Sequence, residues 1–306
     1  MWILGGPRTG STWLLDLLGY PLVPSTEAPS GVAMRPGGSG IRAAAIPINE
    51  PYLGVHLAPV VSSGPSGVFT AADARGLQGP DPSYFFDERY AHAWRPQLRR
   101  LILDRIAAQA DLAARQHGLD SPLIAVKEPN GSHAAPIITS TLPGSRVIFL
   151  LRDGRDVLDS LIDAVSPGGW LAGGPDAASV ASADERKEFL RTNAWLWVHR
   201  ITAVQRAVAA HPTELTVTVR YEDVRADAAA ALPDILSRLG ANVEAPAVAE
   251  AVAATSFETY SPEKKGRGKP LRIARPGHWR ESMSTEEQAA IMEIMGEKLA
   301  ELGYQT

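Results

Sequence analysis

The sequence contains no cysteine in its 306 residues. Disulfides and thiolate metal sites are therefore excluded, which favours a reducing compartment. The sequence also lacks an apolar run near the roughly 20 residues that a transmembrane helix needs. Its first residues show no basic segment followed by an apolar one, so we expect no secretory signal. The expected location is cytoplasmic, with no membrane span.

A surplus of charge is missing too, since the formal net charge is -4 and 21% of the residues are charged. This balance argues against nucleic acid as a bulk electrostatic partner. No cluster of His, Asp and Glu has the spacing of metal ligands, and we expect no metal site. The chain is 45% hydrophobic, enough to bury a large core. Without a repeat or a recognisable linker, residues 1–306 are expected to form a single domain.

Short apolar runs alternate with helical patterns along the chain. The runs predict strands at 2–4, 43–48, 123–126, 147–151 and 215–219. The apolar spacings predict helices at about 83–116, 132–141, 153–164, 184–210, 226–239, 247–253 and 285–302. Residues 20–45, 58–83 and 260–280 are predicted to be irregular. Strands separated by helices predict an α/β fold, with a mostly parallel central sheet flanked by helices.

The first twenty residues contain the strongest local signal. A glycine-rich turn, residues 5–10, lies between the first strand and a helical run. Strand, turn and helix start together form an anion cradle, because backbone N–H groups and the helix dipole point at one spot. Ser11 and Thr12 add hydroxyls, and Arg8 adds a charge that can fork onto phosphate oxygens. The domain is therefore expected to be P-loop-like, although a plain connecting turn is an alternative.

The turn differs from the phosphate-binding loop G-x-x-x-x-G-K-[ST] at one position. Ser11 stands where that loop has its lysine, which removes the main support for an ordinary ATPase or GTPase. The segment instead resembles the 5′-phosphosulfate loop of sulfotransferases that use 3′-phosphoadenosine 5′-phosphosulfate (PAPS). That loop has the form P-[KR]-[ST]-G-[ST]-[ST]-[WL]. The resemblance implies a set of cofactor-binding residues: Pro7, Arg8, Thr9, Gly10, Ser11, Thr12 and Trp13.

Arg152 and Ser160 form a second candidate anion site. Arg152 directly follows the predicted strand at 147–151, and Ser160 lies about two helical turns further on. The two side chains could converge on one phosphate. From these residues by themselves, a surface arginine paired with Asp153 or Asp156 is equally open. The segment resembles the R-x(7)-S motif by which sulfotransferases bind the 3′-phosphate, in spacing and in setting.

Three later stretches also resemble the family. Tyr221-Glu-Asp resembles its Y-E-D and Thr255-Ser-Phe257 its T-S-F, which implies that Tyr221, Thr255 and Phe257 lie near the adenine. Without the resemblance, core packing is the simpler reading of the two rings. Residues 272–280 resemble the late loop R-x-G-x-x-G-x-W-[KR]. This implies cofactor contacts for Arg272, Arg275 and Gly277, although an alanine replaces the first glycine and weakens the case for Arg275.

Sulfuryl transfer needs cations near the leaving group and a base for the acceptor proton. Arg8 is the expected cation by its position in the loop. Lys127 is the second, because Lys127-Glu-Pro resembles the K-[DE]-P of tyrosylprotein-type and bacterial relatives. In that branch a glutamate after the second strand is the base, and the resemblance implies Glu50.

Other bases stay open at this point. His56, Glu128 and His133 are the competitors of Glu50. Cytosolic relatives use a histidine in K-T-H, and Pro129 stands at that place here. The chain is therefore expected to lie closer to the glutamate-base branch than to the histidine-base branch.

The resemblance implies an enzyme that moves a sulfuryl group from PAPS to a hydroxyl of a small molecule, glycoside or lipid. The product is 3′-phosphoadenosine 5′-phosphate (PAP). A P-loop-type small-molecule kinase and a non-catalytic nucleotide-binding module are the alternatives. The excess of arginine over lysine is typical of a GC-rich bacterial source. Acceptor-binding loops are expected at about 20–45, 56–83 and 164–182, whose composition has no readable code. The oligomeric state cannot be derived from the sequence.

Overall fold

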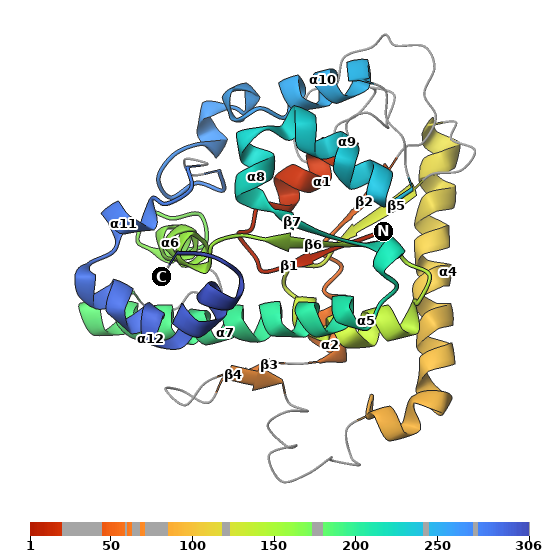
Figure 1. Cartoon of the computed structure of the whole chain (residues 1–306), viewed down its shortest axis with the longest axis horizontal. Helices are drawn as coiled ribbons and strands as arrows, with labels where there is room; N and C mark the ends of the chain where they lie inside the picture. The colour runs from red at the N-terminus through yellow and green to blue at the C-terminus, as the bar shows by residue number, and fades with distance from the viewer. Residues whose placement is uncertain are drawn as a thin grey trace.

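A computed structural model describes residues 1–19, 45–58, 60–62, 68–70, 85–117, 123–172, 180–240, 245–271 and 275–305. A five-stranded sheet forms the centre of the fold (Figure 1), in the order β2-β5-β1-β6-β7. Its strands are β1 (Trp2–Gly5), β2 (Ala45–Asn49), β5 (Leu123–Lys127), β6 (Val147–Leu151) and β7 (Thr216–Arg220). All neighbouring strands pair in parallel. The predicted α/β fold with a mostly parallel sheet is confirmed.

The burial and composition of β1, β6 and β2 agree with their places in the sheet. All five residues of β6 and all four of β1 are buried, as expected for central parallel strands that are covered on both faces. Pro47 lies in β2, which is at the edge of the sheet. An edge strand tolerates proline because a missing N–H costs little where no neighbour needs it.

Helices cover both faces of the sheet (Figure 1). Alternate residues of each strand point to opposite faces, and this divides the core in two. Phe149 of β6 packs in the core shared with α7 (Ala183–Ala209) and α12 (Thr285–Glu301). Ile148 packs in the core shared with α1 (Ser11–Gly19) and α9 (Ala228–Arg238). The hydrophobic run of β6 therefore stabilises both layers at once.

Further helices and strands complete the fold. They are α2 (Leu53–Leu57), β3 (Val60–Ser62), β4 (Val68–Thr70), α4 (Ala91–His117), α5 (Ala135–Thr141), α6 (Gly154–Val165), α8 (Tyr221–Ala226), α10 (Ala245–Ala254) and α11 (Trp279–Ser282). Short 3-10 helices are η3 (Glu88–Tyr90), η4 (Ser132–Ala134), η5 (Thr213–Leu215), η6 (Phe257–Thr259) and η7 (Pro262–Lys264). The predicted helix at 153–164 is confirmed as α6, whose cap Asp153 accepts a hydrogen bond from the Arg155 N–H at 2.9 Å.

Two sequence predictions are wrong. The irregular stretch 58–83 contains the antiparallel pair β3 and β4, whose three-residue strands are too short to show an alternating pattern. The helix expected from residue 83 begins at Ala91, because residues 85–90 form a turn and η3. The helix expected at 226–239 is confirmed as α9, which Asp227 caps by accepting a hydrogen bond from the Ala230 N–H, whereas α8 was not predicted.

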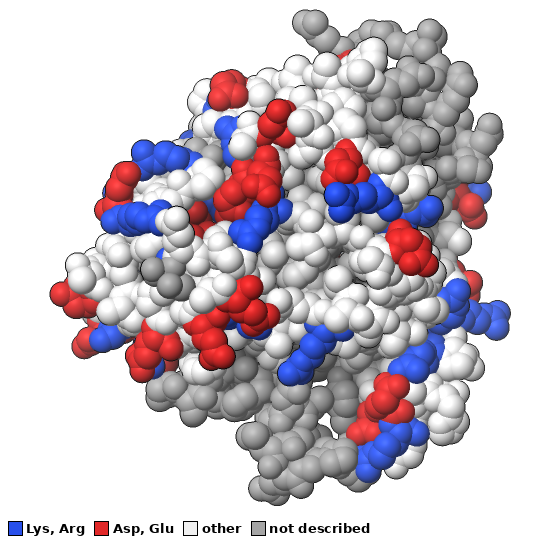
Figure 2. Space-filling model, in the orientation of Figure 1, with Lys and Arg blue, Asp and Glu red and all other residues white. Residues whose placement is uncertain are grey.

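On the face shown in Figure 2, acidic and basic side chains lie next to one another in several places. This mixture agrees with the small net charge of the chain. No helix in the described ranges combines the length and the apolar character that crossing a membrane requires.

Candidate active site

The loop between β1 and α1 has an unusual backbone. Arg8 has a φ of 63° and Gly10 a φ of 85°, in the left-handed region that most residues avoid. A Cβ on Gly10 would lie 2.5 Å from the Tyr221 ring. The Leu14 N–H donates to the Gly10 carbonyl at 2.9 Å, so the N–H groups of the residues between them precede the first intrahelical bond. The loop thus leaves these N–H groups without an intrahelical partner at the N-terminus of α1, which is the backbone arrangement that an anion cradle needs.

Gly10→Ala is expected to lower the free energy of unfolding by about 1–3 kcal/mol. Alanine is strained at this φ, and its methyl group meets the Tyr221 ring. Urea denaturation measures the change. Gly144→Ala is the matched control, because a Cβ at Gly144 meets nothing within 4 Å. Equal stabilities of the two variants would contradict the prediction.

Arg152 and Ser160 both reach the loop. Arg152 Nη1 donates to the Arg8 carbonyl at 2.7 Å, and Arg8 Nε donates to Ser160 Oγ at 3.0 Å. The Arg152 guanidinium also lies 4.5 Å from the centre of the Tyr221 ring. Asp153, offered by the sequence as a partner of Arg152, is instead paired with Arg155 at 2.9 Å. The structure thus brings the two anion motifs together.

Three acids on α6 bind the late loop and the segment that precedes it. Asp156 and Asp163 accept hydrogen bonds from the Gly277 and Gly268 N–H groups, each at 2.7 Å. Asp159 Oδ2 lies 2.9 Å from His278 Nδ1. Burial raises the pKa of Asp156. Sequence reasoning missed this set, although a spacing of three and four residues places the acids on one helix face.

Two residues of the late loop have partners within the structure. Arg275 is exposed and pairs with Glu281, so the structure does not bring it to Arg152. The Gly277 N–H donates a hydrogen bond to Asp156. This glycine therefore helps to attach the late loop to α6. Arg272 lies outside the described residues.

The expected adenine residues gather around Trp13. Its Nε1 donates to the Thr255 carbonyl at 2.9 Å, and its ring meets Tyr221 edge-on at 6.0 Å between centroids. The Thr255 hydroxyl donates to the Ala251 carbonyl of α10 at 2.8 Å. Phe257 lies two residues further on, with the Lys265 ammonium 5.4 Å from its ring centre. Trp13, Tyr221 and Thr255 are thus brought together beside the loop.

Lys127 connects Glu50 to the loop. Its Nζ donates to Glu50 Oε1 at 2.7 Å and to Thr12 Oγ1 at 2.8 Å, and the side chain is 1% exposed. The other oxygen, Oε2, accepts from Asn130 Nδ2 at 3.1 Å and from the Tyr52 hydroxyl at 3.3 Å. Sequence reasoning missed Asn130 and Tyr52, whose only signal is their closeness in sequence to Lys127 and Glu50. A carboxylate and a buried ammonium therefore face the anion loop together.

The other three candidate bases have different surroundings from Glu50. Glu128 is 0% exposed, and burial raises its pKa to about 7. His133 is buried, and its Nε2 lies against the Ala58 carbonyl. His56 is exposed on α2. Of the four candidates, Glu50 is the one that the structure pairs with Lys127.

Arg8 contacts other residues than the pair of Glu50 and Lys127. Its Nη2 donates to the Pro270 carbonyl at 2.9 Å, and its guanidinium lies 5.5 Å from the centre of the half-exposed Trp170 ring. Because Arg8 and Thr12 belong to one loop, the Ser160 side and the Glu50 side share a single scaffold.

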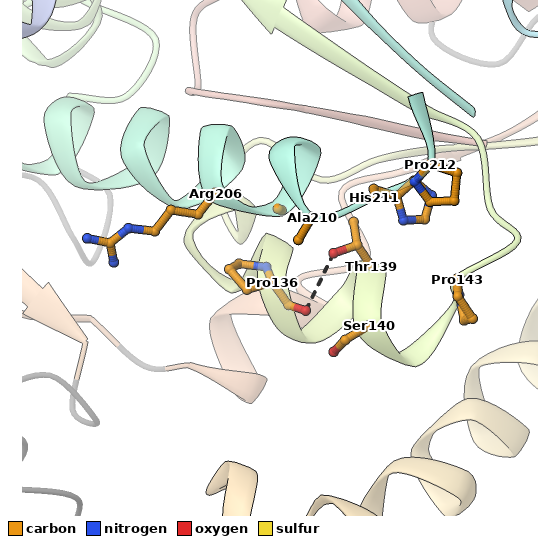
Figure 3. A pocket seen from close by; sticks show the side chains of 9 residues that line it. Pro136, Thr139, Ser140, Pro143, Arg206, Ala210, His211 and Pro212 are labelled. Carbon is orange, nitrogen blue, oxygen red and sulfur yellow. Dashed lines mark hydrogen bonds between the residues drawn. The ribbon is translucent and has the colours of Figure 1, made fainter. Parts of the chain in front are cut away.

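A pocket of about 150 Å³ lies between α5 and the end of α7 (Figure 3). Pro143 and His211 line it, just before β6 and β7 begin. It is therefore at the N-terminal edge of the sheet, whereas the anion loop is at the C-terminal edge. No group of three or more acids and histidines in the described ranges could hold a metal ion.

Comparisons with known proteins identify the family and the fold. Residues 1–245 match a family model described as "Sulfotransferase family". A comparison with curated proteins gives no match. The structure of sulfotransferase STF9 from Mycobacterium avium is similar at a TM-score of 0.52 and 16% identity, over 100% of this chain and 77% of that chain. Mouse sulfotransferase SULT7A1 complexed with PAP is similar at a TM-score of 0.51 and 13% identity, over 98% and 83%. At these identities the two structures show a common fold.

Proposed function

The chain belongs to the sulfotransferase family, which its residues 1–245 match, and on that premise we propose how it transfers a sulfuryl group from PAPS to an acceptor hydroxyl. In this proposal Glu50 is the base, and Arg8 and Lys127 are the cations. The observation that carries it is the hydrogen-bonded chain from Glu50 through Lys127 to Thr12. This chain places a proton acceptor and a charge beside the loop.

The residues beside the loop fit the cofactor. The loop and the N-terminus of α1 offer N–H groups to a phosphosulfate. Arg152 Nε is buried, and no described residue accepts a hydrogen bond from it. Such a donor suits a 3′-phosphate. The Ser160 hydroxyl lies close to Arg152, because both residues are hydrogen-bonded to Arg8. The rings of Trp13 and Tyr221 offer a surface for the adenine.

The chemistry follows from the positions of three side chains. PAPS, when bound, supplies the sulfuryl group and leaves as PAP. Glu50 takes the acceptor's proton while the acceptor oxygen bonds to sulfur. Lys127 and Arg8 stabilise the charge that collects on the phosphate as the bond between sulfur and the phosphate oxygen breaks. Both cations are already held by hydrogen bonds, so little reorganisation is needed.

The class of acceptor is a further part of the proposal. We propose a small molecule, glycoside or lipid with a free hydroxyl, in a bacterial cytoplasm. Half-exposed Tyr52 and Trp170 lie beside Glu50 and Arg8, where an acceptor would enter. Residues 20–44 of the expected acceptor loops lie outside the described residues.

The binding of PAP tests the cofactor. Calorimetry is expected to show PAP binding at least tenfold tighter than adenosine 5′-phosphate, a difference of about 1.4 kcal/mol. Arg152→Ala is expected to remove most of that preference, because the guanidinium would lose its bonds to the 3′-phosphate. Arg238→Ala is the control, since this arginine is exposed and paired with Asp234 on α9. Equal affinities of the unchanged protein for the two nucleotides would overturn the proposal, and tighter binding of ATP would favour a kinase.

A further inference from the structure

Glu128 is a buried carboxylate that touches two backbone segments. Its Oε2 accepts a hydrogen bond from the Leu53 N–H at 3.1 Å, and its Oε1 accepts one from the Gly131 N–H at 3.0 Å. Leu53 is the first residue of α2 and directly follows the turn of Glu50 and Tyr52. Gly131 directly follows Asn130, which binds Glu50. Both segments therefore supply groups to the candidate base.

Two glycines let these segments close on the carboxylate. A Cβ on Gly54 would lie 2.0 Å from the Gly131 carbonyl oxygen. A Cβ on Gly131 would lie 2.4 Å from Glu128 Oε1 and 2.6 Å from the Gly54 Cα. Real Cβ atoms do not approach this closely, so only glycine fits at either position. Because the two backbone segments lie so close together, the Glu128 carboxylate accepts hydrogen bonds from both the Leu53 and the Gly131 N–H groups.

The turn that carries Glu50 needs outside support. Glu50 has a φ of 50° and Tyr52 a φ of 56°, a left-handed backbone that persists only where the surroundings hold it. The Glu50 N–H donates to the Lys127 carbonyl at 2.9 Å, which fixes the start of the turn. Glu128 binds the Leu53 N–H and fixes its end. Two consecutive residues of the chain thus hold the turn from both sides.

We propose that Glu128 is a positioning residue that keeps the Glu50 carboxylate on Lys127 and directed at the acceptor. The inference rests on the proposed function, since it takes Glu50 as the base. Glu128 is fully buried with both oxygens engaged, so it acts through the turn and does not touch substrate. Burial also raises its pKa to about 7, so its ionised form costs folding free energy near neutral pH. A residue that served packing only would avoid that cost with a neutral side chain.

A double-mutant cycle tests this role. Glu128→Gln is expected to lower kcat about 10- to 100-fold, because a shift of the base of about 1 Å costs that much. The KM for PAPS and the affinity for PAP are expected to stay within about twofold, since neither depends on the turn. In a protein that already carries Glu50→Gln, the Glu128→Gln change is expected to slow turnover by less than about twofold more. Once the base is absent, its position no longer matters.

The outcomes separate this proposal from the proposed function. If Glu50→Gln keeps full turnover, the base is misassigned and the proposed function fails at that residue. If Glu50→Gln is slow and Glu128→Gln multiplies the loss, Glu128 acts independently of Glu50 and the positioning role is overturned. Thr139→Val is the control for a buried polar change, because the Thr139 hydroxyl bonds its own helix at the Ala135 carbonyl. That variant is expected to keep its kcat.

Folding of the variants is checked by PAP binding and by thermal unfolding. If Glu128→Gln does not fold, Glu128→Asp is used in the same cycle, since it keeps the charge but is too short to reach both N–H groups. Loss of PAP binding in both variants would assign Glu128 to the fold and overturn the proposal.

Discussion

Arg8→Ala is expected to lower kcat about a hundredfold or more, with a much smaller rise in the KM for PAPS. The guanidinium is held by Ser160 and by the Pro270 carbonyl, so its charge is fixed before the reaction begins. A fixed cation stabilises the charge that develops on the leaving phosphate more than it stabilises bound PAPS. Steady-state kinetics with PAPS varied at a saturating acceptor concentration measures the two constants.

Backbone strain must be separated from charge at this position. Arg8 has a φ of 63°, which glycine adopts freely and alanine does not. Arg8→Gly and Arg8→Ala both remove the guanidinium, so they are expected to lose kcat equally while Arg8→Gly is the more stable of the two. An unchanged kcat with a raised KM in Arg8→Gly would show that Arg8 only anchors the cofactor.

Periodic apolar runs and fixed-spacing motifs made much of the fold predictable. The run Val147–Leu151 predicts a central strand, and the structure buries all five of its residues. Arg152 directly follows β6 and Ser160 lies on α6, and the structure brings each of them to Arg8. Both inferences depend on local sequence. The single-domain organisation and the roles of the site residues stay predictions.

Contacts made through the backbone could not be predicted. The Glu128 carboxylate accepts hydrogen bonds from two backbone N–H groups. Every residue except proline has such a group, so no side-chain pattern in the sequence predicts this contact. The same holds for Asp156 and Asp163, whose partners are glycine N–H groups of a distant loop. The motif predicts that Arg275 lies near the cofactor, and the structure pairs its side chain with Glu281. Where a loop carries a substitution within its motif, as at Ala274, spacing no longer fixes where each side chain lies.

Glu50→Gln is expected to lower kcat roughly a hundredfold or more while PAP binds as tightly as before. A carboxylate has about four lone-pair sites, and Glu50 uses three of them for Lys127, Asn130 and Tyr52. The remaining site on Oε1 can receive the acceptor's hydroxyl proton. Glutamine keeps the shape and an acceptor oxygen but does not take up that proton. Turnover with PAPS and calorimetry with PAP measure the two effects separately.

Two further variants distinguish proton transfer from the loss of hydrogen bonds around Glu50. Tyr52→Phe removes one hydrogen bond to Glu50 Oε2 and leaves the base in place, so its loss of kcat is expected to be well below that of Glu50→Gln. Glu88→Gln changes an exposed carboxylate that pairs with Arg95, and it is expected to leave kcat unchanged. His56→Ala tests the exposed histidine on α2. If Glu50→Gln stays near the unchanged protein while His56→Ala is inactive, the base is that histidine, and the link from Glu50 through Lys127 to the loop serves only to hold the lysine.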